Sequence, residues 1–251
     1  MTPETFLTGF PGWAGAEVIE LTGGLTNQTW LVMRDGRKAV LKIDATVRGE
    51  PYNARPTEAA IQSIAAEHDL ANAVIHASEF VLMTEYAEGV VWSKDCFGDD
   101  ANIEKLAVAL RKLHRLPLSG RTFNAVGAAR DYVSRIENPD EAMVKESLRK
   151  VEEGPQPFNL CFCHNDLVAG NIINTPETRF LDWEYACDND PFFDLATVVA
   201  HHGLTAAQSE TLLDVYFDGN GSRWRRQLTR QAKVYEALLY LWQASLLPTI
   251  P

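Results

Sequence analysis

Hydrophobic and polar positions alternate along the first 85 residues, as expected of β-strands that bury one face. Glycine, asparagine and aspartate separate these segments, as they do in tight turns between antiparallel strands. One segment instead repeats its apolar residues every three to four positions, which indicates a helix. The pattern predicts strands at 18–21, 29–33, 39–43, 74–76 and 80–83, and a helix at 56–67. We expect a three-stranded antiparallel meander, then the helix, then two further strands of the same sheet.

The hydrophobic pattern changes after Ala87-Glu88-Gly89, and helical spacing dominates the rest of the chain. It predicts helices at 103–114, 128–151, 193–201, 207–216 and 224–247, the second interrupted near Asn138-Pro139. The sequence therefore predicts an α+β protein with two lobes. Residues 1–87 would form a β-rich N-terminal lobe that binds nucleotide, and residues 88–251 a mainly α-helical C-terminal lobe that carries catalysis and substrate binding.

Composition narrows the class of protein. The 251 residues are 46% hydrophobic and 23% charged, which is typical of globular proteins. The net charge of −11 and the lack of a basic run argue against a nucleic-acid partner. No segment approaches the ~20 apolar residues of a membrane span and no leader pattern is present, so we expect a cytoplasmic protein without a membrane partner. The four cysteines form no C-x-x-C pair, which argues against structural zinc.

A polar motif stands between the apolar runs 160–163 and 172–173. His164, Asp166 and Asn171 follow the spacing H-x-D-x-x-x-x-N, and Asp182 comes eleven residues later. Phosphoryl transfer uses one carboxylate at the attacking hydroxyl, and an amide with a second carboxylate on Mg²⁺. We therefore expect Asp166 to be the catalytic base, Asn171 and Asp182 to be the metal ligands, and His164 to support the loop. The alternatives are ordinary turn chemistry and a His/Asp metallohydrolase, which lacks further histidines at ligand spacing.

The N-terminal part offers candidate nucleotide ligands. Lys42 lies among aliphatic residues of a strand, where alternation would point it to solvent. Its other use is as a phosphate ligand held by a carboxylate, for which Glu58 is the best candidate and Glu67 the second. Gly23-Gly24 would allow close approach of the backbone to phosphates, or would simply turn the chain. The P-loop pattern G-x-x-x-x-G-K-[ST] is absent, which excludes that class of nucleotide-binding protein.

These motifs together resemble the aminoglycoside phosphotransferase and choline/ethanolamine kinase superfamily. The matching residues are His164-Asn165-Asp166, Gly170-Asn171, the run 181–186, Asp190-Pro191 and Phe193-Asp194-Leu195-Ala196. Within the superfamily, Asp-Trp-Glu-Tyr-Ala at 182–186 is most similar to the bacterial choline kinase and thiamine kinase branch. Weaker similarity runs through 23–27, Lys42, Glu58, 84–86 and 110–114, so it covers most of the chain.

The resemblance implies a protein-kinase-like two-lobed fold that uses ATP and Mg²⁺. It implies that Gly23, Gly24 and Asn27 lie at the nucleotide, that Glu85 and Tyr86 contact adenine through the hinge backbone, and that Asp194 braces the catalytic loop. Only eleven residues separate Asp182 from Asp194, too few for the activation segment on which protein kinases dock peptides. We therefore expect no protein substrate. His201-His202 stand where eukaryotic choline kinases have an acidic residue, which puts choline itself in question.

A cationic alcohol would need carboxylates and aromatic faces near the catalytic base. Candidate substrate contacts are Trp183, Glu184, Glu236, Tyr240 and Trp242. The stripe of aromatic and leucine residues that includes Trp242 on the last helix is more often a core face than a cation site. The pair Glu236 and Tyr240 on the adjacent face is the better candidate for a cation site. Three functions remain open: a kinase of choline, ethanolamine or thiamine, an aminoglycoside or macrolide phosphotransferase, and a nucleotide-binding pseudokinase. The intact set of catalytic and metal-binding groups argues against the pseudokinase.

Overall fold

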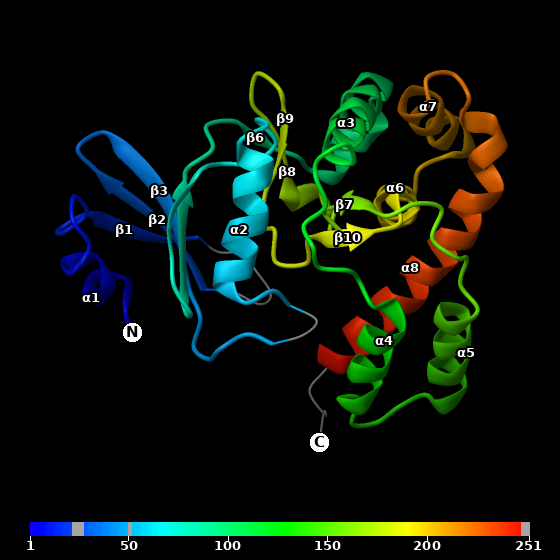
Figure 1. The fold of residues 1–251 in the computed structure, drawn as a ribbon, viewed down its shortest axis with the longest axis horizontal. Helices are drawn as coiled ribbons and strands as arrows, with labels where there is room; N and C mark the ends of the chain where they lie inside the picture. Colours follow the sequence, from blue (N-terminus) through cyan, green and yellow to red (C-terminus); the bar gives the residue numbers. More distant parts are fainter. Residues whose placement is uncertain (22–27, 50–51, 247–251) are drawn as a thin grey trace. The chain divides into compact units, whose positions relative to one another are not determined.

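The computed structural model describes residues 1–21, 28–49 and 52–246, and it divides the chain into two compact units. Unit 1 consists of Met1–Val91 and Ile173–Ala186, and unit 2 of Trp92–Ile172 and Cys187–Pro251. Among the described residues, unit 1 holds most of the strands and unit 2 most of the helices, so the predicted α+β class is confirmed (Figure 1). No helix in the described ranges has the length and apolar character needed to cross a bilayer.

Unit 1 is built on a five-stranded antiparallel sheet of order β1-β2-β3-β5-β4. Its strands are β1 (Glu17–Leu21), β2 (Gln28–Arg34), β3 (Arg37–Ile43), β4 (Val74–Ala77) and β5 (Val81–Glu85). The helices α1 (Pro3–Thr8) and α2 (Arg55–Ala66) complete it, and α2 packs against β4 and β5. The alternation predicted for the strands is real: Ala39, Leu41 and Ile43 are buried on one face of β3. The predicted meander and helix are confirmed.

A second, smaller sheet in unit 1 has the order β6-β8-β9, formed by β6 (Val90–Val91), β8 (Ile172–Asn174) and β9 (Thr178–Phe180). Gly89 permits this pairing, because a Cβ there would lie 2.4 Å from the Asn174 carbonyl oxygen. The sequence prediction ended the N-terminal lobe at residue 87 and assigned 173–186 to the other lobe. The structure instead ends the first segment at Val91 and returns Ile173–Ala186 to unit 1, because the β8–β9 hairpin pairs with β6.

Unit 2 is mainly helical. Its helices are α3 (Asp100–Leu113), α4 (Ala125–Ser134), α5 (Glu141–Glu152), α6 (Pro191–His202), α7 (Ala206–Tyr216) and α8 (Arg225–Leu246). The long helix α8 packs against α4, α5 and α6 (Figure 1). The described residues of this unit also form short 3₁₀ helices: η1 (Lys94–Gly98) before α3, η2 (Ala169–Asn171) before β8, and η3 (Gly221–Trp224) between α7 and α8. The interruption predicted near Asn138-Pro139 is the gap between α4 and α5.

A short antiparallel ribbon forms between β7 (Cys161–Cys163) and β10 (Cys187–Asn189), and the segment that carries His164 and Asp166 follows β7. The helix α6 begins directly after this ribbon. Asp190 caps it by accepting from the Phe192 N–H at 2.9 Å, and Pro191 occupies the first turn. Gly203 ends the helix with φ +65°, a conformation that favours glycine. These local signals fix both ends of the helix that carries Asp194.

Candidate active site

Within unit 1, the ammonium group of Lys42 contacts two carboxylates from distant parts of the sequence. It lies in β3, paired in register with Leu82 of β5. Its Nζ lies 3.3 Å from Glu58 Oε1 on α2 and 2.7 Å from Asp182 Oδ1, which follows β9. Burial opposes the charge of Lys42, but the carboxylates outweigh burial and raise the pKa of Lys42 above its ordinary value. The ammonium therefore stays charged, as a phosphate ligand requires.

A buried ionic network surrounds the Lys42–Glu58 pair. Arg55, which has no exposed side-chain surface, donates to Glu58 at 2.6 Å and to both oxygens of Asp44 at 2.7 Å. Arg48 pairs with Glu184 and lies 3.4 Å from Glu58 and 3.6 Å from Asp44. The network thus joins three cations to four carboxylates, Asp44, Glu58, Asp182 and Glu184, and carries one net negative charge when all are ionised. An excess of carboxylate suits a divalent cation.

In unit 2, Asp194 holds the backbone of the motif segment. Its carboxylate accepts the His164 N–H at 2.9 Å, the Asn165 N–H at 2.7 Å and Nε2 of His114 at 3.0 Å. Hydrogen bonds to a buried carboxylate are stronger than those between neutral groups. Asn165 has φ +64°, and its side-chain oxygen accepts from Asn189 at 2.7 Å. Asp194 therefore braces the loop, in the role that the resemblance implied.

The braced loop presents Asp166 and Asn171 to each other. Nδ2 of Asn171 donates to Asp166 Oδ2 at 2.8 Å and to the Asp166 carbonyl at 2.9 Å. The amide nitrogen of Asn171 is thereby committed to Asp166, and its oxygen is the atom suited to a metal. Asn171 Oδ1 and the Asp182 carboxylate are hard oxygen donors, which fit Mg²⁺. His164 is fully buried, and its backbone supports the loop.

His202 supports the same loop from α6. Its Nε2 donates to the Leu167 carbonyl at 3.0 Å, and its ring stacks on Phe97 with centroids 3.6 Å apart. Burial lowers the pKa of His202 to about 4, and His201 and Lys94 act in the same direction. The ring is therefore neutral at pH 7, with its proton on the nitrogen that faces Leu167. The helix predicted at 193–201 stops one residue before His202, and the sequence gave no sign of the contact between this histidine and the loop.

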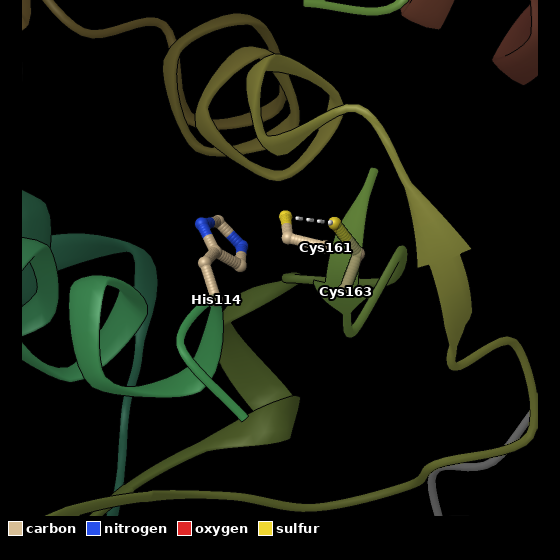
Figure 2. Close-up of side chains that lie close together, drawn as sticks. All are labelled: His114, Cys161 and Cys163. Carbon is tan, nitrogen blue, oxygen red and sulfur yellow. Dashed lines mark hydrogen bonds between the residues drawn. The ribbon is translucent and has the colours of Figure 1, made fainter. Parts of the chain in front are cut away.

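His114, Cys161 and Cys163 form a compact cluster beneath the loop, and their ligand atoms lie within 4.8 Å of one another (Figure 2). Both nitrogens of His114 are engaged, Nδ1 with the Tyr216 hydroxyl at 2.7 Å and Nε2 with Asp194 at 3.0 Å. Burial raises the pKa of the Cys163 thiol, which favours the neutral form over the thiolate that metals bind. The hydrogen bond from His114 to Asp194 connects the cluster to the motif loop, so the cluster contributes to packing and loop support.

The other residues predicted to contact the nucleotide belong to the segment after β1 and to the end of β5. Gly23, Gly24 and Asn27 lie outside the described residues. Glu85 ends β5, where its carbonyl accepts from Asn72 at 3.0 Å, and the Tyr86 N–H donates to the Lys38 carbonyl at 3.3 Å. These contacts fix the backbone of the segment, and its contact with adenine stays a prediction.

The predicted substrate contacts fall into two groups. Trp183 is fully buried and donates to the Phe180 carbonyl at 3.2 Å, and the Glu184 carboxylate pairs with Arg48. Neither environment favours a substrate contact. On α8, Glu236 is exposed and Tyr240 and Trp242 are half-buried. Helical spacing puts Trp242 on the face of Tyr235, the residue seven positions earlier.

Comparison with known proteins agrees with this arrangement. The phosphotransferase enzyme family matches residues 17–233. Protein LicA of Haemophilus influenzae is 31% identical over 207 residues, and the match covers 77% of this chain and 61% of LicA. The thiamine kinase of Salmonella typhi is 26% identical over 243 residues, covering 94% of this chain and 82% of that kinase.

Among solved structures, a choline/ethanolamine kinase family protein from Mesorhizobium loti is similar with a TM-score of 0.73 and 27% identity, covering 95% of this chain and 83% of that one. This similarity confirms the predicted protein-kinase-like fold, and the family model confirms the predicted superfamily. The match extends through Lys42, Asp166, Asn171 and Asp182. The chain belongs to the phosphotransferase enzyme family.

Proposed function

We propose that this protein is a kinase that transfers the γ-phosphate of ATP to the hydroxyl of a small amino alcohol of the choline, ethanolamine or thiamine type. The observation that carries the proposal is the loop braced by Asp194, on which Asp166 and Asn171 are held together by two hydrogen bonds. The relatives named choline/ethanolamine kinase family protein and thiamine kinase support this substrate class.

In the proposed reaction, Asp166 accepts a hydrogen bond from the substrate hydroxyl and aims its oxygen at the γ-phosphorus. A bond forms between that oxygen and phosphorus, and the bond from phosphorus to the ADP oxygen breaks. The hydroxyl proton passes to Asp166 late in the transfer, because a loose transition state demands little proton abstraction at first. Asn171 orients the Asp166 carboxylate through the bond at 2.8 Å.

In this proposal Lys42 binds the phosphates of ATP, and Glu58 and its arginine partners fix the position of the Lys42 ammonium group. Asn171 and Asp182 are the residues that would hold Mg²⁺. Mg²⁺ held there would supply positive charge that offsets the charge developing on the transferring phosphate. Gly23, Gly24, Asn27, Glu85 and Tyr86 complete the proposed nucleotide site. Dependence on ATP fits the cytoplasmic location predicted from the sequence.

The proposed acceptor is a cation, and α8 is the element best suited to meet it. Burial, and then the charge of Asp166, raise the pKa of the Tyr235 hydroxyl. This influence supports the placement of the Tyr235 face of α8 near the Asp166 carboxylate, which belongs to the same unit. Trp242 lies on the same face and is half-buried, so we favour it as the aromatic contact of the ammonium group. Glu236 and Tyr240 flank this face and remain candidate contacts.

The proposal is tested by ADP release from ATP and Mg²⁺ with choline, ethanolamine, thiamine and an aminoglycoside offered in turn. We expect turnover with at least one of the three amino alcohols, and loss of that turnover in Asp166→Ala. Turnover with the aminoglycoside alone would move the protein to the antibiotic-modifying class. ATP binding that survives Asp166→Ala, with no turnover on any acceptor, would overturn the proposal in favour of a pseudokinase.

A further inference from the structure

The segment that carries Asp182 needs support from outside itself. Residues 181–186 form no helix or strand, and Asp182 has φ +62°, a conformation that is uncommon for residues other than glycine. One turn bond, from the Ala186 N–H to the Trp183 carbonyl at 3.0 Å, is internal to the segment. A carboxylate held on such a turn changes position easily unless neighbouring residues restrain it.

Asn53 supplies much of this restraint. Its backbone N–H donates to the Glu184 carbonyl at 2.9 Å, and its Nδ2 donates to the Ala186 carbonyl at 2.9 Å and the Trp183 carbonyl at 3.4 Å. One residue therefore binds three of the carbonyls that follow Asp182. Only 1% of Asn53 is exposed, so these bonds are shielded from water.

Arg48 adds a side-chain restraint on the same turn. Its guanidinium pairs with the Glu184 carboxylate, and only 9% of the side chain is exposed. The same group reaches Glu58 at 3.4 Å, so it connects the turn to the carboxylate that holds Lys42. It also lies over the ring of Tyr52, whose ring packs against Tyr185 of the turn with centroids 4.9 Å apart.

We propose that Asn53 and Arg48 are positioning residues for the metal–nucleotide site, which hold the Asp182 carboxylate where a divalent cation and the phosphates require it. The inference rests on the proposed function, because it takes Asp182 as the metal ligand. Neither residue touches substrate in this proposal. Arg48 acts through Glu184, and Asn53 acts through the backbone of the turn. Mutation of a residue that orients a metal ligand without contacting the metal typically weakens metal binding by about 10–100-fold.

The test measures binding of Mn²⁺ in the presence of AMP-PNP, by electron paramagnetic resonance, together with Tm of the unliganded protein. The variants are Asn53→Ala, Arg48→Ala and the charge-conserving Arg48→Lys. Arg34→Ala is the matched arginine control, because Arg34 pairs with the exposed Asp35 at the far end of β2. Ile61→Val is the stability control, because Ile61 is a buried residue of α2. This change should lower Tm without removing a contact to the Asp182 turn.

We expect Asn53→Ala and Arg48→Ala to raise the dissociation constant for Mn²⁺ by about 10–100-fold, with partial rescue in Arg48→Lys and wild-type binding in both controls. Variants that lose Tm like Ile61→Val but bind Mn²⁺ as wild type would overturn the inference, since the two residues would then be structural alone. A wild-type protein that does not bind Mn²⁺ with AMP-PNP would overturn it as well. If Mn²⁺ binding weakens in the Asn53 and Arg48 variants as expected, but the wild type phosphorylates no alcohol, the proposed function is refuted and the inference remains supported.

Discussion

His202 makes the stability of unit 2 depend on pH in a way that can be calculated from its surroundings. The ring is 8% exposed, and its pKa falls from 6.5 to about 4 in the folded protein, mainly because burial disfavours the charged form. The unfolded chain therefore binds a proton more readily than the folded one between these two values. The contribution of His202 to folding is complete above pH 6.5, is lost as the pH falls from 6.5 toward 4, and changes no further below that.

The size of the effect follows from proton linkage. With a pKa of 6.5 unfolded and about 4 folded, lowering the pH from 7 to 5 removes about 2 kcal/mol of unfolding free energy. In His202→Gln the amide can still donate to the Leu167 carbonyl, but it has no proton to gain in this range. We expect the wild type to lose about 2 kcal/mol more than His202→Gln between the two pH values.

The assay is urea unfolding at pH 7 and pH 5, followed by tryptophan fluorescence. His68→Gln is the matched control, because His68 is exposed beyond the end of α2, in the other unit. The pH dependence of this control should equal that of the wild type. Equal losses of stability in the wild type and in His202→Gln would refute the reasoning, since His202 would then have the same proton affinity in both states.

Two further predictions concern the brace and the small sheet. Asp194→Asn replaces the carboxylate that accepts three hydrogen bonds, each worth about 1.5–3 kcal/mol when the acceptor is charged. We therefore expect a lower Tm and a lower turnover. A variant unchanged in both quantities would contradict the role of Asp194 as a brace. Gly89→Ala puts a Cβ against the Asn174 carbonyl oxygen and should lower the unfolding free energy, measured in urea, by about 1–3 kcal/mol. The control Gly98→Ala, whose Cβ would meet no atom within 4 Å, should lower it less. Equal losses in the two variants would contradict the close approach at Gly89.

The sequence predicted those parts of the fold that local patterns determine. The alternation in 39–43 correctly indicated a strand with a buried face, and the helical spacing at 193–201 correctly indicated α6. Its caps, Asp190 and Gly203, place the ends of the helix at Pro191 and His202. The return of Ile173–Ala186 to unit 1 was not predictable in this way. It depends on pairing between β6 and β8, which are 80 residues apart, and a period-two pattern does not specify a distant partner.

The candidate site shows the same division. The spacing of His164, Asp166 and Asn171 identified the loop. Lys42 with Glu58 could be named because a lysine that binds phosphate is held by a carboxylate. Arg48 and Asn53 gave no comparable signal, because an arginine and an asparagine in a polar connection are ordinary surface residues until the fold brings the Asp182 turn against them. Glu184 was expected to face substrate, and only its pairing with Arg48 shows that its charge is already engaged.

The central claim is that Asp166 promotes transfer of the γ-phosphate to a small alcohol. Its most direct test is formation of the phosphorylated alcohol, followed by ³¹P NMR, in the wild type and in the isosteric Asp166→Asn, with ATP affinity measured by calorimetry on the same samples. The account predicts a phosphoester signal from the wild type, a rate lower by about 10²–10⁴-fold in Asp166→Asn, and unchanged ATP affinity. Phosphoester formed by Asp166→Asn at the wild-type rate would contradict it.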